Sequence, residues 1–326
     1  MKKFILVRSP MRISFVGGGT DFKDYYNKFD GLVFNTSINK YVYIAINQFH
    51  DINKCLLKYS KSEHVKKLDA IEHPLIKNAL SLTKLWGLDI NSIADIPSGT
   101  GLGSSSSFTV GLIHALNSIK KKKINRNMLA ESACKVEINM AKSPIGKQDQ
   151  YSAAFGGLNK FEFKKNENVK ITNFNNKIDT SSFKNNLIIF NTGIQKKNFK
   201  ILKEQKKNIK SGSQFKNLHQ MKESVNNFIK YLKMEDYKVC GDIIDYNWNL
   251  KKKLSTNINN NFFNEVYNLA KKNGAYGGKI LGAGGRGYLL LIAPKKNHRT
   301  IKKKLYKLEE LKFNFDTEGS KILYEA

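Results

Sequence analysis

The glycine- and serine-rich segment at residues 97–107, Pro-Ser-Gly-Thr-Gly-Leu-Gly-Ser-Ser-Ser-Ser, is the part of the chain best suited to hold an anion. It follows a predicted strand and leads directly into an apolar helical pattern. Glycines let backbone amides approach an anion closely, and a helix N-terminus adds unpaired N–H groups and a positive dipole end. A flexible linker is the alternative, but a linker rarely separates a strand from a helix. The segment therefore predicts a phosphate-binding loop.

Two common nucleotide-binding motifs do not explain this loop. A P-loop requires Gly-Lys followed by Ser or Thr, and residues 97–107 contain no lysine. The only literal Gly-x-Gly-x-x-Gly sequence lies at 282–287, where Tyr-Leu-Leu-Leu-Ile follows and predicts a strand. A dinucleotide-binding motif opens a helix instead. Both the P-loop and the Rossmann folds are therefore poor fits.

Two carboxylates downstream of the loop could take part in phosphoryl transfer. Asp149 lies in Gly-Lys-Gln-Asp-Gln-Tyr-Ser-Ala-Ala-Phe-Gly-Gly (146–157), and Glu137 lies 12 residues upstream on a predicted helix. Mg²⁺ prefers oxygen ligands, and a positioned carboxylate can accept the proton of a hydroxyl group. From the residues alone, a helix cap or an ion pair explains Asp149 equally well. Among small and apolar residues, Glu137 could be a surface residue or a metal ligand, and the residues alone favour the surface position.

Two further glycine-rich segments accompany the loop. Residues 8–21 read Arg-Ser-Pro-Met-Arg-Ile-Ser-Phe-Val-Gly-Gly-Gly-Thr-Asp, and residues 279–287 read Lys-Ile-Leu-Gly-Ala-Gly-Gly-Arg-Gly. With residues 97–107 between them, the three segments resemble motifs 1, 2 and 3 of the GHMP kinases, which include galactokinase and the homoserine, mevalonate and phosphomevalonate kinases. The resemblance covers essentially the whole chain.

This resemblance implies a fold and a reaction. The fold would be α+β with two domains: an N-terminal ATP-binding domain (1–178) like the second domain of ribosomal protein S5, and a C-terminal ferredoxin-like domain (179–326). The reaction would be ATP-dependent phosphoryl transfer with Mg²⁺, and ATP and acceptor would lie between the domains. Phosphoryl transfer needs mainly in-line positioning and neutralisation of charge, which suits these residue types.

The resemblance also assigns roles to individual residues. Asp149 would accept the proton of the acceptor hydroxyl or orient that hydroxyl, and Arg12 would support it or stabilise the transition state. Glu137 and Ser105 would bind Mg²⁺. The residues implied for the nucleotide are Pro97, Gly99, Gly101, Leu102, Gly103, Ser104, Ser105 and Ser106. Those implied for the acceptor are Arg8, Gly18, Gly19, Thr20, Asp21, Lys196, Gly284 and Gly285.

Within the superfamily the chain most resembles the D-glycero-D-manno-heptose 7-phosphate kinases. The resemblance rests on Gly-Gly-Gly-Thr-Asp (17–21), on the 148–157 string, on Thr-Gly-Ile-Gln-Lys (192–196) and on Phe-Asp-Thr-Glu-Gly-Ser (315–320). It implies phosphorylation of the anomeric hydroxyl to give the 1,7-bisphosphate, a step toward GDP-heptose and surface glycans. The chain departs from that group in two places, with Arg286 in motif 3 and with Lys196 where an arginine is expected.

Other functions stay open from the sequence. The chain could be another GHMP sugar kinase of the fucokinase or galactokinase kind, or a catalytically silent sensor of ATP and sugar. The net charge of +29 suggests a nucleic-acid partner, but only five of the 56 basic residues are arginine, the residue favoured for bidentate phosphate and base contacts. The lysine runs at 120–123, 251–253 and 302–304 are interpreted as solvated faces. We therefore expect no nucleic-acid partner.

The regular elements that would position these residues alternate along the first half. Strands are predicted at 4–7, 12–16, 32–46, 88–96 and 187–190, hairpins at 161–171 and 277–293, and two short strands at the C-terminus. Helices are predicted from Pro74 to Gly87, after the serines at 104–107, at 126–141, through most of the second half, and around Ile301, Leu305 and Leu308. The polar stretch at 175–186 is the expected linker.

Composition limits the cellular context. No apolar run reaches the roughly 20 residues of a membrane span, and Arg8, Pro10 and Arg12 interrupt the N-terminal apolar stretch. The three cysteines (Cys55, Cys134 and Cys240) are far apart and predict neither disulfides nor a zinc site. We expect a cytoplasmic protein without membrane contact, acting as a monomer or homodimer on a small sugar phosphate.

Overall fold

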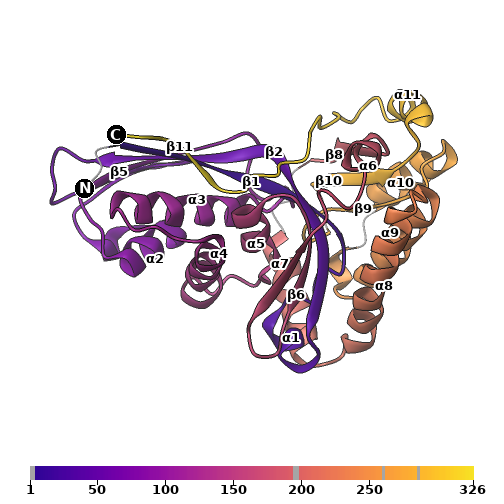
Figure 1. Cartoon of the computed structure of the whole chain (residues 1–326), viewed down its shortest axis with the longest axis horizontal. Helices are drawn as coiled ribbons and strands as arrows, with labels where there is room; N and C mark the ends of the chain where they lie inside the picture. Colours follow the sequence, from indigo (N-terminus) through magenta and orange to yellow (C-terminus); the bar gives the residue numbers. More distant parts are fainter. Residues whose placement is uncertain (1–3, 194–197, 259–260, 285–286) are drawn as a thin grey trace.

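The computed structural model describes residues 4–193, 198–258, 261–284 and 287–326, and these form two β-sheets with helices packed against them (Figure 1). The predicted α+β class with two domains is confirmed. The described strands form two sheets. The larger sheet has eight strands in the order β11-β1-β2-β5-β3-β4, with β6 paired to β2 and β7 paired to β6. The smaller sheet has three strands in the order β8-β10-β9. Strand β3 runs parallel to β5, and the other pairs are antiparallel.

The larger sheet is built around two long strands. Its strands are β1 (Phe4–Val16), β2 (Gly31–Gln48), β3 (Cys55–Lys58), β4 (Ser62–Val65), β5 (Leu88–Ala94), β6 (Leu158–Phe163), β7 (Val169–Asn173) and β11 (Lys321–Glu325). One half of β2 pairs with β5 and the other half pairs with β6. The segments predicted at 4–7 and 12–16 are one continuous strand. Strands β1 and β2 thus extend from the outer end of the sheet to the second domain (Figure 1).

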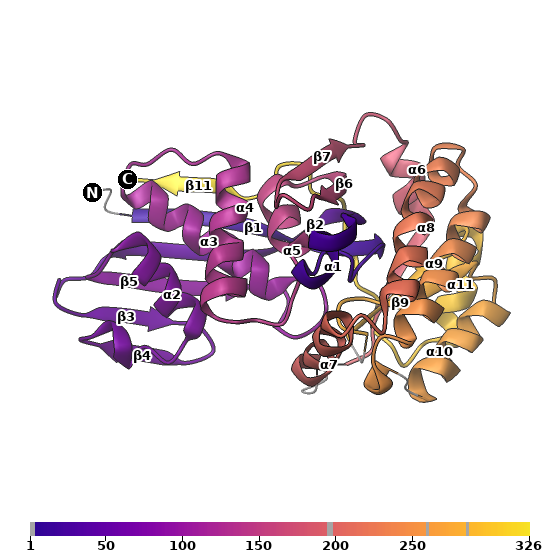
Figure 2. The ribbon, with the colours of Figure 1, turned by 90° about the horizontal axis from the view of Figure 1, so that it is seen from below.

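Helices cover one face of this sheet (Figures 1 and 2). They are α2 (Pro74–Thr83), α3 (Ser104–Ile119), α4 (Arg126–Cys134) and α5 (Gln148–Phe155), with α1 (Lys23–Phe29) at the far end of β1 and a short 3₁₀ turn at Leu68–Ala70. Pro74 begins α2, and an apolar side of α3 packs on β1 and β2. The helix predicted at 126–141 is α-helical only to Cys134 and continues as a π-helix over Lys135–Met140.

The second domain holds the smaller sheet and the remaining helices. Its elements are α6 (Thr180–Asn185), β8 (Leu187–Asn191), α7 (Asn198–Lys210), α8 (Phe215–Lys233), α9 (Tyr237–Lys252), a 3₁₀ turn at Thr256–Ile258, α10 (Asn261–Lys272), β9 (Gly277–Ile280), β10 (Tyr288–Ile292) and α11 (Lys295–Lys304). Helix α9 packs on β9 and β10, and α8 packs on α9 and reaches β1 and β2. The predicted linker at 175–186 therefore contains a short helix, whose Asp179 cap accepts from the amides of Ser181 and Ser182.

The C-terminal residues do not stay with the second domain. Strand β11 pairs antiparallel with β1 at the edge of the larger sheet, so the expected division into 1–178 and 179–326 does not match the two sheets. Only β11 is a named strand after α11, where two short strands were expected. The chain thus enters the second domain once and returns, which places the start of β1 and the end of β11 side by side at the outer end of the first domain (Figure 1).

All three cysteines are buried and free. Within the described ranges no helix is long and apolar enough to cross a membrane.

Candidate active site

A cavity of about 310 Å³ opens between the two domains. The first domain contributes the turn after β1, the N-terminus of α3, the loop at 143–146 and the start of α5. The second domain contributes side chains from α7 and α9 and the backbone turn after β9. The three glycine-rich segments that are far apart in the sequence therefore meet at one cavity.

The loop before α3 has the backbone conformation expected of an anion cradle. Gly99, Gly101 and Gly103 all have positive φ values, of 80°, 87° and 78°. Gly103 stands at the N-cap of α3, where no side chain caps the helix. Because the first amides of a helix lack intrahelical partners, the N-terminus of α3 offers donors and a positive dipole end to the cavity.

Arg12 and Asp149 form a bidentate ion pair on the wall of this cavity. Arg12 Nε and Nη2 donate to the two carboxylate oxygens of Asp149 at 2.7 Å each, and Arg12 Nη1 donates to the carbonyl oxygen of Gly101 at 2.6 Å. A Cβ at Gly103 would lie 3.3 Å from Asp149 Oδ2, so the carboxylate lies directly beside the start of α3. Fork-shaped pairs of this kind fix orientation as well as charge.

A bulge where β1 pairs with β2 accounts for the orientation of Arg12 toward the cavity. The register between β1 and β2 shifts between Pro10 and Met11. Ser9 lies against Gly111 of α3, and Arg12, three residues later, contacts α5 on the same face of the sheet. A bulge changes which side chains face a given side of a strand. Arg8 accordingly lies outside the cavity, where it pairs with Glu318 and stacks over the Tyr41 ring at 4.6 Å.

Glu137 is buried and accepts three hydrogen bonds. Ser105 Oγ donates at 2.6 Å, Ser106 Oγ at 2.8 Å and Gln150 Nε2 at 2.7 Å. The side chain is 1% exposed, so the surface position favoured by its neighbours in the sequence is wrong. Burial raises the pKa of Glu137, although the three hydrogen bonds act in the opposite direction. The change from α- to π-helix directly before Glu137 sets the face on which this carboxylate lies, and such turns are frequent at functional sites.

Asp21 forms another part of the cavity wall. It is 1% exposed, and it accepts from the Gly19 amide at 2.9 Å, the Gln148 amide at 3.2 Å and Gln148 Nε2 at 3.3 Å. Burial raises the pKa of Asp21, and the Asp149 carboxylate raises it further. A Cβ at Gly146 would lie 2.1 Å from Asp21 Oδ2, so only glycine fits there. Gln148 Oε1 is buried without a partner and is available to a hydroxyl donor.

The second domain closes the cavity through close backbone contact. A Cβ at Gly101 would lie 2.4 Å from the carbonyl oxygen of Leu281, and a Cβ at Gly282 would lie 2.3 Å from the Cα of Gly101. Gly282 and Ala283 line the cavity with Lys251 of α9. The loop before α3 therefore rests directly on the turn after β9.

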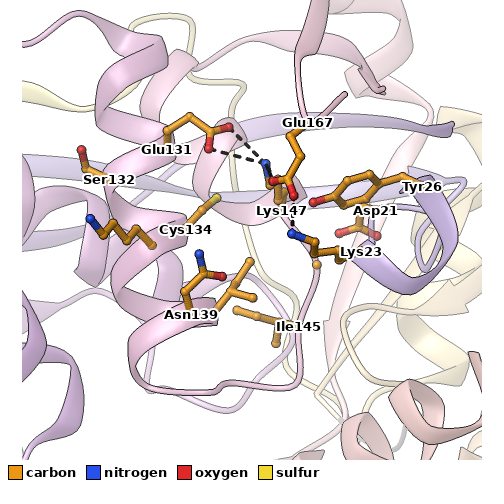
Figure 3. Close-up of a pocket in the computed structure, with 13 residues that line it drawn as sticks. Asp21, Lys23, Tyr26, Glu131, Ser132, Cys134, Asn139, Ile145, Lys147 and Glu167 are labelled. Carbon is orange, nitrogen blue, oxygen red and sulfur yellow. Dashed lines mark hydrogen bonds and ion pairs between the residues drawn. The ribbon is translucent and has the colours of Figure 1, made fainter. Parts of the chain in front are cut away.

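A second hollow of about 300 Å³ lies on the other side of Asp21 (Figure 3). In it Lys147 lies between Glu131 (3.3 Å) and Glu167 (3.5 Å), and Lys23 pairs with Glu167. Three lysines and three carboxylates line this hollow: Lys23, Lys135, Lys147, Asp21, Glu131 and Glu167. Its charges are balanced, so it is less suited to an anion than the cavity beside α3.

The expected site residues separate into three groups. Those that line the cavity are Arg12, Gly18, Gly19, Asp21, Gly99, Gly101, Gly103, Ser104, Ser105, Ser106, Glu137 and Asp149. Those that the structure places elsewhere are Arg8, Thr20, Pro97, Leu102 and Gly284. Lys196, Gly285 and Arg286 lie outside the described residues, so their expected roles stay predictions.

Thr20, Leu102 and Gly284, which the structure places elsewhere, make contacts that hold the structure around the cavity. Thr20 Oγ1 lies 2.8 Å from the Gly17 carbonyl oxygen and accepts from the Leu32 amide at 2.9 Å, so it holds the turn after β1. The carbonyl oxygen of buried Leu102 accepts from the Arg12 amide at 2.9 Å. The site beside Gly284 is filled by Trp248. Pro97 is exposed.

Several cavity residues were not predicted from the sequence. Gln148 lines the cavity and donates to Asp21, and Gln150, which is buried behind the lining, donates to Glu137, so the Gln-Asp-Gln string around Asp149 was an available signal. Lys251 belongs to a run interpreted as solvated, yet its side chain is buried. It shares the spacing of the buried residues Ile244, Asn247 and Trp248 along α9, which is the pattern of the inward face of a helix.

Two models of one family match the chain. The GHMP kinases N terminal domain matches residues 65–157, and GHMP kinases C terminal matches residues 228–309. Together the two models match more than half of the chain. The chain belongs to the GHMP kinases. This kinase is therefore a phosphotransferase with an alcohol group as acceptor, in a family that uses ATP.

Individual relatives of the kinase differ in the acceptor that their names give. It is 28% identical over 315 residues to a D-glycero-alpha-D-manno-heptose 7-phosphate kinase from Campylobacter jejuni, covering 92% of this chain and 93% of that protein. It is 24% identical to a galactokinase from Pyrococcus furiosus, with 91% of each chain covered. A solved D-glycero-D-manno-heptose 1-phosphate kinase from Bacteriodes thetaiotaomicron has a TM-score of 0.79 at 21% identity, covering 98% of this kinase and 99% of that chain. At that identity the structural likeness shows the fold.

Proposed function

We propose that this kinase phosphorylates the anomeric hydroxyl of D-glycero-D-manno-heptose 7-phosphate with ATP, giving the 1,7-bisphosphate. One observation carries the proposal: Asp149, held on both oxygens by Arg12, lies beside the N-terminus of α3 in the cavity that also contains Asp21. A phosphate-binding helix start and a fixed carboxylate in one cavity are what phosphoryl transfer to a hydroxyl requires.

The nucleotide side of the site fits Mg·ATP, which supplies the phosphoryl group. The open N-terminus of α3 and the positive-φ glycines of its loop suit the phosphate chain. Glu137 and the Ser105 hydroxyl, 2.6 Å apart, are oxygen ligands of the type that Mg²⁺ takes together with phosphate oxygens. Ser106 and Gln150 hold the other carboxylate oxygen and so orient Glu137.

The acceptor side of the site fits a polyhydroxyl compound. Asp21 is a buried hydrogen-bond acceptor, and the unpartnered Gln148 Oε1 lies beside it. Asp149 would orient the attacking hydroxyl and receive its proton as the new P–O bond forms and the bond to ADP breaks. Arg12 would stabilise the negative charge that remains on this side of the reacting group. The heptose 7-phosphate assignment is supported by the name of the Campylobacter jejuni relative.

The test is a kinase assay over a panel of sugars and sugar phosphates with ATP and Mg²⁺. Phosphorus NMR of the product identifies the new phosphate ester and its position. We expect the highest kcat/KM for heptose 7-phosphate, with an anomeric phosphate as product. A preference for an unphosphorylated hexose would replace this acceptor by one of the galactokinase kind. Absence of transfer to every member of the panel would reject a sugar as acceptor.

A further inference from the structure

Lys251 is the residue before the end of α9 and lies at the wall of the active-site cavity. Its side chain is 8% exposed, although the two lysines that follow it are more accessible. It is the cation that the second domain contributes to the described cavity lining, and the first domain contributes Arg12. The two cations differ in how they are paired.

Arg12 is fully engaged, whereas Lys251 is not. All three Arg12 nitrogens have partners, two of them in Asp149. Lys251 Nζ donates to the Gly282 carbonyl oxygen, which is a neutral partner. Among the described residues no carboxylate oxygen lies within 4.0 Å of Lys251 Nζ. An ammonium group carries three donors, so two of them are free to face the cavity.

In the part of the chain that the structure describes, two other lysines are buried outside the active-site cavity. In the neighbouring hollow Lys147 lies between two carboxylates, Glu131 and Glu167 (Figure 3), whereas Lys279 donates to the Phe15 carbonyl oxygen at 2.9 Å.

Lys251 has no carboxylate partner among these described residues and, unlike Lys279, it lines the cavity, where a bound anion can compensate its buried charge. Burial lowers the pKa of Lys251 to about 8, with Arg12 acting in the same direction and Asp21 and Asp149 opposing it.

The position of Lys251 indicates the kind of group that would pair with it. Its partner Gly282 touches Gly101, the centre of the loop that leads to α3. Its ammonium group therefore lies close to the loop that leads to α3, within electrostatic range of Asp149 and Asp21. An anion bound beside Asp149 at the α3 N-terminus would therefore lie near two positive groups, the helix N-terminus and the Lys251 ammonium group.

We propose that Lys251 Nζ binds a phosphoryl oxygen of the bound substrates and is thus a substrate-binding cation of this site. The inference rests on the proposed kinase reaction. Two phosphoryl groups could supply the oxygen: the terminal phosphoryl of the nucleotide and the phosphate ester of the sugar. In either case Lys251 supplies from the second domain a positive charge in addition to that of Arg12, whose nitrogens already have partners in the first domain.

The test compares Lys251→Met and Lys251→Arg with Lys253→Met, an exposed lysine two residues further on, as the matched control. Calorimetric titrations use ADP, its non-hydrolysable triphosphate analogue AMP-PNP, heptose 7-phosphate and the unphosphorylated heptose. If Lys251 binds the terminal phosphoryl group, Lys251→Met lowers the affinity for AMP-PNP by about 30-fold or more and leaves the affinity for ADP unchanged. If Lys251 binds the sugar phosphate, the affinity for heptose 7-phosphate falls by the same factor, and the affinity for the unphosphorylated heptose does not change.

The pH profile provides a second measurement. The charged groups around Lys251 are Arg12 from β1, Asp21 from the turn after it, Asp149 from α5 and Lys279 from β9. Because Lys251 loses its proton as pH rises through about 8, wild-type kcat/KM should fall there. Lys251→Arg keeps its charge and should lack this alkaline limb.

Folding failure would not explain a loss in Lys251→Met. Replacing an unpaired buried ion by an apolar side chain of similar volume is often neutral or stabilising, so we expect a Tm equal to or above that of the wild type. A folded Lys251→Met enzyme with wild-type affinity for all four ligands would overturn the inference. A wild type that transfers no phosphoryl group but still needs Lys251 for AMP-PNP would instead reject the proposed reaction.

Discussion

At the scale of single residues, the proposed reaction depends on Arg12 and Asp149. Two hydrogen bonds of 2.7 Å fix the carboxylate plane, and a third bond ties the same guanidinium to Gly101 in the loop before α3. The Arg12 side chain therefore joins the proposed acceptor side to the proposed nucleotide side. A change at either residue should affect turnover more than substrate affinity.

Asp149→Asn is expected to lower kcat by about 100-fold or more, because the amide is no base and can accept from Arg12 through one oxygen only. Affinity for ATP should stay within about threefold of the wild type, since the α3 N-terminus is unchanged. Steady-state kinetics and calorimetric titration of AMP-PNP measure the two effects. Unchanged turnover would remove Asp149 from the catalytic role.

Glu137→Gln is expected to separate stability from activity. Burial raises the pKa of Glu137, so the folded state binds the proton of the Glu137 carboxyl group more tightly than the unfolded state does. The free energy of unfolding therefore falls as pH rises from the usual glutamate range toward the folded pKa. Without Mg²⁺ the variant should be at least as stable as the wild type near about pH 7 and less dependent on pH.

The same variant should lose activity, because an amide is a weak ligand for Mg²⁺. We expect kcat to fall by about 100-fold or more, and added Mg²⁺ should no longer alter nucleotide affinity. Thermal unfolding between acid and neutral pH, with and without Mg²⁺, provides the measurement. A variant that is less stable than the wild type at neutral pH, or one with normal metal dependence, would contradict this account.

Residue identity predicted part of this site and missed another part. The glycines and serines before α3 were found because their conformational and hydrogen-bonding properties follow from residue type alone. Lys251 was misjudged, and for Glu137 the neighbouring residues favoured a surface position that only the family resemblance reversed, since burial of a charge depends on neighbours from distant segments. The helical spacing on α9 was the one local sign that Lys251 faces inward.

At the scale of elements, the ends of β1, α3 and β9 must meet with little tolerance. Gly101 has a φ of 87°, and a Cβ there would lie 2.4 Å from the Leu281 carbonyl oxygen. Gly99 has a similar φ of 80°, but a Cβ there would meet nothing within 4 Å. Substitutions at Gly99 and Gly101 therefore distinguish the effect of backbone strain from the effect of the contact between the domains.

Gly99→Ala should cost about 1 kcal/mol from its positive φ alone. Gly101→Ala should cost about 3 kcal/mol or more, because it adds a collision with backbone that cannot move without separating the domains. Gly101→Ala should also weaken AMP-PNP binding, since it displaces the cradle. Chemical unfolding and calorimetric titration compare the two variants. Equal losses would mean that the contact between Gly101 and Leu281 is not needed.

Helices and strands were predicted where the hydrophobic periodicity is local. Irregularities within an element that depend on contacts with other parts of the fold were missed. Helices α2 and α3 and the hairpin of β6 and β7 were found close to their observed bounds. The bulge at Pro10/Met11 could not be read from the sequence, and it sends Arg8 and Arg12 to different surroundings. The π-helix at Lys135–Met140 was likewise predicted as ordinary α-helix.

At the scale of the whole molecule, two sheets share one apolar core. The Phe15 ring of β1 lies 5.1 Å from Phe183 of α6 and 5.8 Å from Phe228 of α8. The C-terminal strand β11 adds a second connection by pairing with β1. The sequence predicted two domains correctly, but a boundary at 178/179 cuts through this shared core, because long-range pairing leaves no local mark in the chain.

The kinase should therefore unfold in a single transition. Because Phe15, Phe183 and Phe228 belong to one buried cluster, loss of either domain exposes apolar surface of the other. Differential scanning calorimetry should give one peak, and AMP-PNP should move the whole peak to higher temperature. A fragment of residues 1–178 lacks α8 and β11 and should show no cooperative transition. Two separated peaks, or a fragment that melts cooperatively, would show that the first domain is stable without the second. The cavity between the domains would then depend on docking of two independent units rather than on one continuous core.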